Sequence, residues 1–484
     1  MTTRRGASRA DLDHHDWLDE DFVRDRRGAE RRAQERRARE RRERRRREAS
    51  QPAPATERRS SAERRAGADR RVAPRRGPAE RRSAAAAQVL GPGVGEKRAL
   101  VFVTVMLLLY GLVMAYSASA AEAYFEHGSS FYLIGRQVVY AGLGLGVMLA
   151  LSRVDYGWYR KLALPFSLLA FAGLVAVLVP GVGTSINGAR RWIFIGGQSV
   201  TPSEFAKLAA VMLVAALIAS RPKQAKTAGG FVLLVLIGIV PAAVLIMLEP
   251  DLGTTLVLVA AVGAVLVAGG ARLRHLSALV VTGAAAVLAL IVMEPYRMER
   301  LTTFLDPWKD PQGTGFQTTQ SLISIASGRI FGVGLGNSVQ KFGYLPEQSS
   351  DMITGIIGEE LGLIGLVVLL ALYAGLAWAC FRIALTCREL FGKLLAAGIT
   401  AVIVGQACIN IGAALGVLPL TGVPLPLVSL GGTSMLVVLA GVGVLLNIAT
   451  NRRSHIVLSA ERQERPAGGR RHRRAPAAGS RRRR

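Results

Sequence analysis

The sequence predicts an all-α membrane protein that crosses the bilayer several times. Half of its 484 residues are hydrophobic and the mean hydropathy is +0.31, which is more apolar sequence than a soluble protein of this length requires. These residues are gathered into runs, and about 20 apolar residues are needed to cross the hydrocarbon core as a helix. Ten segments qualify: 99–120, 133–152, 162–180, 203–220, 230–248, 252–270, 276–293, 352–381, 394–415 and 431–449.

The positive charge is concentrated at the two ends of the chain. Residues 1–98 have a net charge of +12 and residues 451–484 one of +10, out of +27 in total. Three parts are therefore predicted: a basic tail over 1–98, a membrane domain over 99–450, and a basic tail over 451–484. The tails are rich in Arg and poor in apolar residues, so we expect them to be disordered, apart from a solvated helix that Glu–Arg pairs can support over 29–48.

A sequence pI of 11.1 is also typical of nucleic-acid-binding proteins. Both basic tails adjoin the membrane, however, so we expect anionic membrane lipids as their partners and no nucleic acid. Docking of a cytoplasmic protein onto the tails is the alternative.

The short loops indicate the orientation. Ten spans place both termini on one side, and basic residues are frequent in the loops of that side, which predicts that it is cytoplasmic. The long loop 294–351, between spans seven and eight, is then extracytoplasmic, and its length predicts a functional role. The basic residues concerned are Arg153, Arg160, Lys161, Arg221, Lys223, Lys226, Arg272, Arg274, Arg382, Arg388, Arg452 and Arg453.

A polar pair stands at the start of the fourth span. Thr201 and Pro202 suit the N-cap and the first position of a helix, and Glu204 and Lys207 follow three residues apart. The two charged residues are expected either to form a local ion pair or to line an active cavity.

The fifth and sixth spans are joined almost without a linker. Pro250 ends one helix, and Asp251 is placed to cap the next. As an alternative, Glu249 and Asp251 together could bind a divalent cation such as Mg or Mn.

Arg190 and Arg191 stand beside Trp192 in an outer loop, against the usual bias of basic residues toward the cytoplasm. They are expected either to anchor the loop at the membrane interface or to bind an anionic headgroup, because guanidinium groups suit phosphate oxygens.

The last outer loop, 416–434, contains three prolines and several glycines, so it cannot form a continuous helix. Irregular apolar backbone at membrane depth must be enclosed by protein or line a cavity. We therefore expect a re-entrant segment beside a substrate path, with Ser429 and Thr433 in it.

Segment 332–362 carries several polar groups around the start of the eighth span. Asp351 is predicted either to cap this span or to act as a general base at a cavity mouth. Glu359 and Glu360 are expected to face a cavity or a partner rather than lipid.

Taken together, these segments resemble the FtsW/RodA family of shape, elongation, division and sporulation proteins. The matching pieces follow the family's order over about 350 residues, and the stretch from Gly334 to Tyr344 is most similar to the division branch. They are Gly188–Ile193 (GARRWI), Pro202–Lys207 (PSEFAK), Pro250–Thr254 (PDLGT), Gly334–Ser338 (GLGNS), Tyr344–Glu347 (YLPE), Asp351 with Gly358–Gly362 (GEELG), and Thr421–Pro426 (TGVPLP) with Gly431–Ser434 (GGTS).

Three positions depart from the family pattern. Thr201 replaces a Gln, Ser349-Ser350-Asp351-Met352 replaces His-Thr-Asp-Phe, and Leu427-Val428-Ser429-Leu430 replaces Phe-Val-Ser-Tyr. The acid at position 351 is retained.

The resemblance implies a peptidoglycan glycosyltransferase that polymerises lipid II with a lipid-linked glycan at the outer face of the cytoplasmic membrane. It implies a single inverting displacement with undecaprenyl pyrophosphate as leaving group, and Asp351 as the base. Arg190, Arg191 and Lys341 are the candidates for neutralising the pyrophosphate, with a divalent cation as a possible helper. The residues expected to line or shape the cavity are Glu204, Lys207, Asp251, Glu347, Ser429 and Thr433.

The resemblance also implies a class B penicillin-binding protein and other division proteins as partners, at the division septum. The alternatives are a lipid II flippase, an elongation polymerase of the RodA type and a non-catalytic scaffold. A flippase needs charges along a path through the bundle. The candidate residues instead gather on the outer side, which favours an enzyme.

Overall fold

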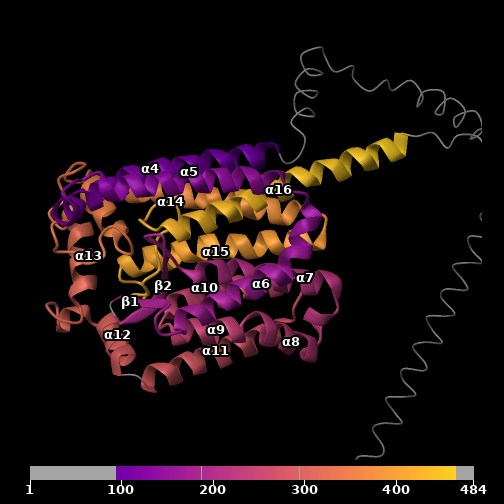
Figure 1. Ribbon diagram of the computed structural model, residues 1–484, viewed down its shortest axis with the longest axis horizontal. Helices are drawn as coiled ribbons and strands as arrows, with labels where there is room; N and C mark the ends of the chain where they lie inside the picture. Colours follow the sequence, from indigo (N-terminus) through magenta and orange to yellow (C-terminus); the bar gives the residue numbers. More distant parts are fainter. Residues whose placement is uncertain (1–93, 187, 294, 465–484) are drawn as a thin grey trace, which may run out of the picture. The chain divides into compact units, whose positions relative to one another are not determined.

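The computed structural model describes residues 94–464 except 187 and 294 (Figure 1). Residues 1–93 and 465–484, where disordered cytoplasmic tails were predicted, lie outside the described part. The two ends of the membrane domain differ slightly from the prediction, since the first helix begins at Val94 and the last continues to Glu464.

An all-α polytopic membrane protein is confirmed. Over the described residues, nine helical segments are long and apolar enough to cross a membrane, and α10 is a shorter apolar helix at the place of the predicted sixth span. The helices are α4 (Val94–His127), α5 (Tyr132–Arg153), α6 (Tyr156–Leu178), α7 (Pro202–Ser220), α8 (Ala228–Gly238), α9 (Val240–Leu248), α10 (Leu252–Ala268), α11 (Leu273–Met293), α14 (Ile353–Thr386), α15 (Leu390–Ala414) and α16 (Gly432–Glu464).

The predicted fifth span consists of two helices, α8 and α9. They are separated at Ile239, and a proline lies within the first two positions of α9. Pro241 has no N–H to donate to the preceding turn, and its ring would crowd that turn, so the helix is interrupted there.

The loop 181–202 forms a small antiparallel sheet that the sequence had not predicted. Strand β1 (Gly183–Ile186) pairs with β2 (Ala189–Ile195), and β2 pairs with β3 (Gln198–Val200). The sheet lies at the same end of the bundle as α12 (Pro295–Leu305) and α13 (Phe316–Ser327), which the long loop contributes together with the short helix η2 (Pro307–Lys309) (Figure 1).

The helices near the centre of the bundle are largely enclosed by protein, whereas the outer ones are not. The most apolar stretch of α16 is 83% buried, and that of α5 only 22%. Helices α7, α10 and α15 pack against one another, and their facing side chains form the apolar core. The candidate site lies at the end of this core that carries the sheet, α12 and α13.

Candidate active site

Asp351 lies in a compact turn immediately before α14. The backbone N–H groups of Ser350 and Met352 both donate to the Glu347 carbonyl at 3.1 Å, and the Ser350 hydroxyl donates to the Glu347 carboxylate at 2.8 Å. Glu347 adopts a left-handed φ of 52°, which closes the turn. The N-cap position of α14 is Met352, one residue after Asp351.

Asn410 on α15 fixes the backbone of this turn. Its side-chain amide donates to the Asp351 carbonyl and to the Val423 carbonyl, both at 2.8 Å, and accepts a hydrogen bond from the Thr354 hydroxyl at 3.1 Å. These three partners belong to other segments of the site. The sequence prediction did not include Asn410, although an Asn in an apolar span is a recognisable signal.

Ser429 joins the Pro-rich segment 421–431 to the same turn. Its hydroxyl donates to the Ser350 carbonyl and accepts from the Leu425 N–H at 2.9 Å. Gln137 on α5 donates to the Ser429 carbonyl at 3.0 Å. The apolar side chains of this irregular segment are buried, as Val423 and Val428 illustrate. This burial is what irregular backbone in such a protein requires.

Gly422 brings the Asp351 carboxylate and the Arg191 guanidinium to one place. A Cβ atom built on Gly422 would lie 3.5 Å from Asp351 Oδ2 and 3.6 Å from Arg191 Nη1. Gly422 has a φ of 69°, a conformation in which side chains are strained. Asp351 and Arg191 are 160 residues apart in the chain, and their side chains face the same small space.

Arg191 on β2 is bound to the turn between α9 and α10. Its Nη2 donates to the Pro250 carbonyl at 2.5 Å, its Nε donates to the Glu249 carbonyl at 3.3 Å, and its Nη1 lies 3.5 Å from Asp251 Oδ2. Asp251 also accepts from the Thr254 N–H at 2.9 Å and caps α10, as predicted.

Glu249 is fully buried, and neither of its carboxylate oxygens has a hydrogen-bond partner among the described residues. Burial, and then the neighbouring Asp251, raise the pKa of Glu249 to about 8, while Arg191 acts in the opposite direction. The carboxyl is therefore mainly neutral at pH 7. Asp251 is paired to Arg191, and cation binding at this turn stays a prediction.

Arg190 points to the other side of β2. Its Nη1 donates to the carbonyl of Leu178, the last residue of α6, at 3.3 Å. The structure thus separates the two arginines that the sequence had grouped, and Arg191 alone faces Asp351.

Glu204 and Lys207 form a buried ion pair with an Nζ–Oε1 distance of 2.8 Å. The pair reaches beyond its own helix, because Lys207 also donates to Gln406 on α15 at 2.8 Å. Gln406 in turn donates to the Pro424 carbonyl at 2.9 Å. The pair therefore connects α7 with α15 and with the Pro-rich segment.

Thr433 connects the start of α16 with the sheet. Its hydroxyl donates to the Ser199 carbonyl at 3.1 Å and accepts from the Thr201 N–H at 3.3 Å. These contacts make it part of the wall that supports the site.

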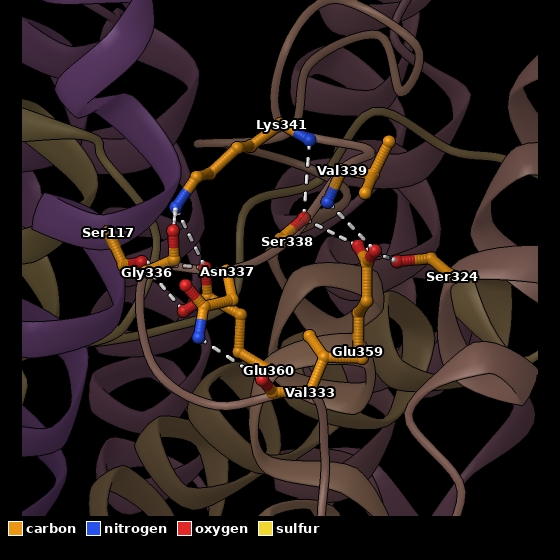
Figure 2. Close-up of polar contacts among 10 residues, drawn as sticks. All are labelled: Ser117, Ser324, Val333, Gly336, Asn337, Ser338, Val339, Lys341, Glu359 and Glu360. Atoms are coloured by element: carbon orange, nitrogen blue, oxygen red, sulfur yellow. Dashed lines mark hydrogen bonds and ion pairs between the residues drawn. The ribbon is translucent and has the colours of Figure 1, made fainter.

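Lys341 is almost fully buried, and its ammonium group contacts Glu360 at 3.1 Å and the Gly336 carbonyl at 2.5 Å (Figure 2). Any contact of Lys341 with a pyrophosphate would require this pair to open. Three polar residues of the candidate site were not identified from the sequence. They are Ser117, which contacts Glu360, Gln406, which contacts Lys207, and Asn410, which contacts the Asp351 carbonyl.

A cavity of about 190 Å³ lies between α12, α13 and the segment preceding Gly422. Its lining combines hydroxyl, amide and carboxyl groups with one aromatic ring, and Leu420 places it two residues from Gly422. The lining residues are Glu299, Thr303, Phe304, Thr314, Gln317, Thr318, Leu418 and Leu420. Over the part of the chain described, no three His, Cys, Asp or Glu side chains are grouped as a metal site would need.

Comparison with known proteins identifies relatives over the whole membrane domain. The family model of the FtsW, RodA and SpoVE proteins, described as cell cycle protein, matches residues 98–454. Stage V sporulation protein E of Bacillus subtilis is 43% identical over 352 residues, which make up 72% of this chain and 96% of that protein. The probable peptidoglycan glycosyltransferase FtsW of Pseudomonas fluorescens is 38% identical over 356 residues, covering 72% of this chain and 87% of that protein.

Solved structures show the same architecture. A chain from a structure on the coordination of polymerization and crosslinking by a peptidoglycan synthase complex superposes with a TM-score of 0.61 at 33% identity, covering 73% of this chain and 97% of that chain. The rod shape determining protein RodA of Thermus thermophilus superposes with a TM-score of 0.55 at 29% identity, covering 73% of this chain and 96% of that chain.

Proposed function

This chain belongs to the FtsW/RodA/SpoVE family, and we propose that it polymerises lipid II into glycan strands at the outer face of the cytoplasmic membrane during septal cell-wall synthesis. It is a multi-pass membrane protein and a peptidoglycan glycosyltransferase. The observation that supports this substrate and chemistry is that the Asp351 carboxylate and the Arg191 guanidinium both border the space beside Gly422. A carboxylate and a guanidinium that face one space suit a reaction that removes a proton and releases a pyrophosphate.

In the proposed reaction, the 4-hydroxyl of the acceptor sugar attacks the anomeric carbon of the lipid-linked glycan. Asp351 accepts the hydroxyl proton while the new C–O bond forms. The bond to undecaprenyl pyrophosphate breaks, and its electron pair leaves with the pyrophosphate. The linkage changes from α to β, so one displacement and one base are sufficient. A base in position contributes typically about 10²–10⁴-fold to such a step.

Arg191 is the best-placed residue to neutralise the leaving pyrophosphate. A guanidinium has five N–H donors, and the contacts of Arg191 with Glu249, Pro250 and Asp251 do not use all of them. These contacts also fix the guanidinium in advance, which favours charge stabilisation in the transition state. Lys341 is a weaker candidate, because its ammonium group would have to leave Glu360. Arg190 is a weaker candidate because it points to the other side of β2, where it donates to the Leu178 carbonyl.

The cavity beside Leu420 supports a place for a sugar next to the bond being formed. Threonine hydroxyls and the Gln317 amide can exchange hydrogen bonds with sugar hydroxyl and N-acetyl groups, and Phe304 offers an apolar face. Leu418 and Leu420, which line the cavity, belong to the segment that leads to Gly422.

For the wider setting, we propose that a class B penicillin-binding protein and other division proteins are the partners, at the septum. A related chain is part of a peptidoglycan synthase complex, which is consistent with this. We further propose that both termini are cytoplasmic, that the tails contact anionic lipids and not nucleic acid, and that the role is in division rather than elongation.

The decisive experiment is lipid II polymerisation by the purified full chain with its cognate class B penicillin-binding protein. Wild type should produce glycan strands, and folded Asp351→Asn should produce none. Asp306→Asn, an exposed acid of the same long loop, serves as the matched control and should behave like wild type. Equal strands from wild type and Asp351→Asn would remove Asp351 as the base. No strands from wild type, combined with lipid II crossing vesicle bilayers, would instead support a flippase.

A further inference from the structure

Helix α14 is broken at Gly362, where φ is 66° and ψ is −160°. The break separates a half-helix, residues 353–361, from the remaining stretch, residues 363–386. Beyond the break, apolar side chains such as Leu363 and Val367 are exposed. Before it, all residues from Ile353 to Glu360 are buried. The half-helix is thus enclosed by protein, and its first residue follows the Asp351 turn.

A short loop, residues 328–334, supplies the hydrogen bonds that the break removes. We call it the strap. The N–H groups of Val333 and Gly334 donate to the carbonyls of Glu359 and Glu360, at 2.9 and 3.0 Å. In the other direction, the N–H groups of Leu363 and Ile364 donate to the carbonyls of Arg329 and Ile330, at 2.9 and 3.2 Å. Helix ends inside a membrane protein need such partners.

The strap and the half-helix meet at backbone-to-backbone distance. A Cβ atom on Gly362 would lie 2.6 Å from the Ile330 carbonyl oxygen, and one on Gly332 would overlap the Glu360 carbonyl. Side chains at these positions would push the two segments apart, so glycine is required at both.

Two carboxylates at the C-terminal end of the half-helix bind the loop that follows the strap (Figure 2). Glu359 accepts from the hydroxyls of Ser324 and Ser338, at 3.2 and 2.5 Å, and from the Val339 N–H at 3.0 Å. Glu360 accepts from the Ser117 hydroxyl of α4, at 2.6 and 2.8 Å, and from the Lys341 ammonium at 3.1 Å.

We propose that Lys341, Glu359 and Glu360 are positioning residues for Asp351. The inference rests on the proposed function, in which Asp351 is the base. The half-helix is about 14 Å long at about 1.5 Å per residue. It connects its charged C-terminal end, Glu359 and Glu360, rigidly to the Asp351 turn. The loop 335–350 runs from the same charged end back to the turn. Both chain segments that lead to Asp351 are therefore held at Glu359 and Glu360.

The buried charges of Lys341, Glu359 and Glu360 favour a role in positioning Asp351 over a role in stability alone. Burying charges is expensive, and apolar residues of similar volume usually give equal or greater stability. The contacts of two buried carboxylates and a buried lysine instead define one register between α4, α13, the loop and α14. A displacement of about 1 Å at a reacting group can reduce the rate about 100-fold.

The test compares two variants in the lipid II polymerisation assay with the full chain and its partner. Ser338→Ala removes a donor to Glu359, and the double variant Lys341→Met/Glu360→Gln removes both charges together so that none is left unpaired. We expect kcat to fall about 10-fold to 100-fold with KM unchanged. Ser327→Ala is the matched control, since this neighbouring hydroxyl donates to the Ser324 carbonyl within its own helix, and it should retain wild-type kcat.

The outcomes separate this inference from the proposed function. If Asp351→Asn is inactive while Ser338→Ala and the double variant keep wild-type kcat, positioning is refuted and the function stands. If the double variant raises KM and Ser338→Ala changes nothing, Lys341 binds the pyrophosphate instead. If the double variant does not fold, Ser117→Ala gives the same test on Glu360, because Lys341 still neutralises the carboxylate.

Discussion

Replacing Glu249 with glutamine should stabilise the protein at high pH and leave it nearly unchanged at low pH. The carboxyl has a pKa of about 8 in the folded protein and an ordinary value of 4.5. Below pH 4.5 it is protonated in both the folded and the unfolded state and has no effect on the pH dependence. Between these values the unfolded state releases the proton and the folded state retains it, so folding weakens as pH rises.

The size of the effect follows from these two values. Each pH unit between them changes the free energy of unfolding by about 1.4 kcal/mol. Relative to pH values below 4.5, wild type should therefore lose about 3 kcal/mol from this residue by pH 7, and about 5 kcal/mol by pH 9. The glutamine of the Glu249→Gln variant has no proton to lose, so the variant should gain the same amounts relative to wild type. At about 2 °C per kcal/mol, the difference in Tm approaches about 10 °C at pH 9.

Thermal unfolding of both purified proteins in detergent at about pH 5, 7 and 9 measures this difference, because the contributions of the other titrating groups cancel between the two proteins. Glu126→Gln, at an exposed carboxylate, controls for loss of a surface charge. A difference in Tm that is the same at all three pH values, or that shrinks as pH rises, would show that Glu249 is ionised in the folded protein, contrary to its burial without partners.

Two further substitutions test the buried polar contacts. Lys207→Met leaves the Glu204 carboxylate buried and unpaired, so it should reduce the free energy of unfolding by about 3–5 kcal/mol. Adding Glu204→Gln should recover most of the loss in the same unfolding measurement, and no recovery would mean that lost packing dominates. Asn410→Ala removes the donor to the Asp351 carbonyl, so kcat for polymerisation should fall by about tenfold or more with KM little changed. A fall in Tm with wild-type kcat would limit Asn410 to folding.

The spans could be predicted because each depends only on local apolar composition. All ten predicted segments correspond to helices, including the one that Pro241 divides. The small sheet was missed because its strands are short and are defined by pairing between β1, β2 and β3 rather than by a repeating pattern. The long loop was predicted to be functional, but its helices α12 and α13 were not predicted.

Some residues of the candidate site were selected from the sequence, but their contacts were not. Asp351 and Arg191 were both selected, yet only the folded chain shows that Gly422 brings them together. Lys341 stands in a loop between predicted spans, where a lysine is expected to be exposed. Its partner Glu360 lies on a helix whose break at Gly362 has no distinct signal among the neighbouring glycines. The roles of these residues stay predictions until the variants are measured.

The short length of α10 has a consequence for how the protein responds to its lipid surroundings. With 17 residues, it is about 26 Å long at about 1.5 Å per residue, less than the hydrocarbon thickness of about 30 Å. Its neighbours α7 and α15 enclose it, so few of its side chains are exposed. Hydrophobic mismatch acts on surfaces that touch acyl chains, such as those of α5 and α6. A thicker or thinner bilayer should therefore change the tilt of the outer helices first, while Asp251 at the end of α10 keeps its place beside Arg191.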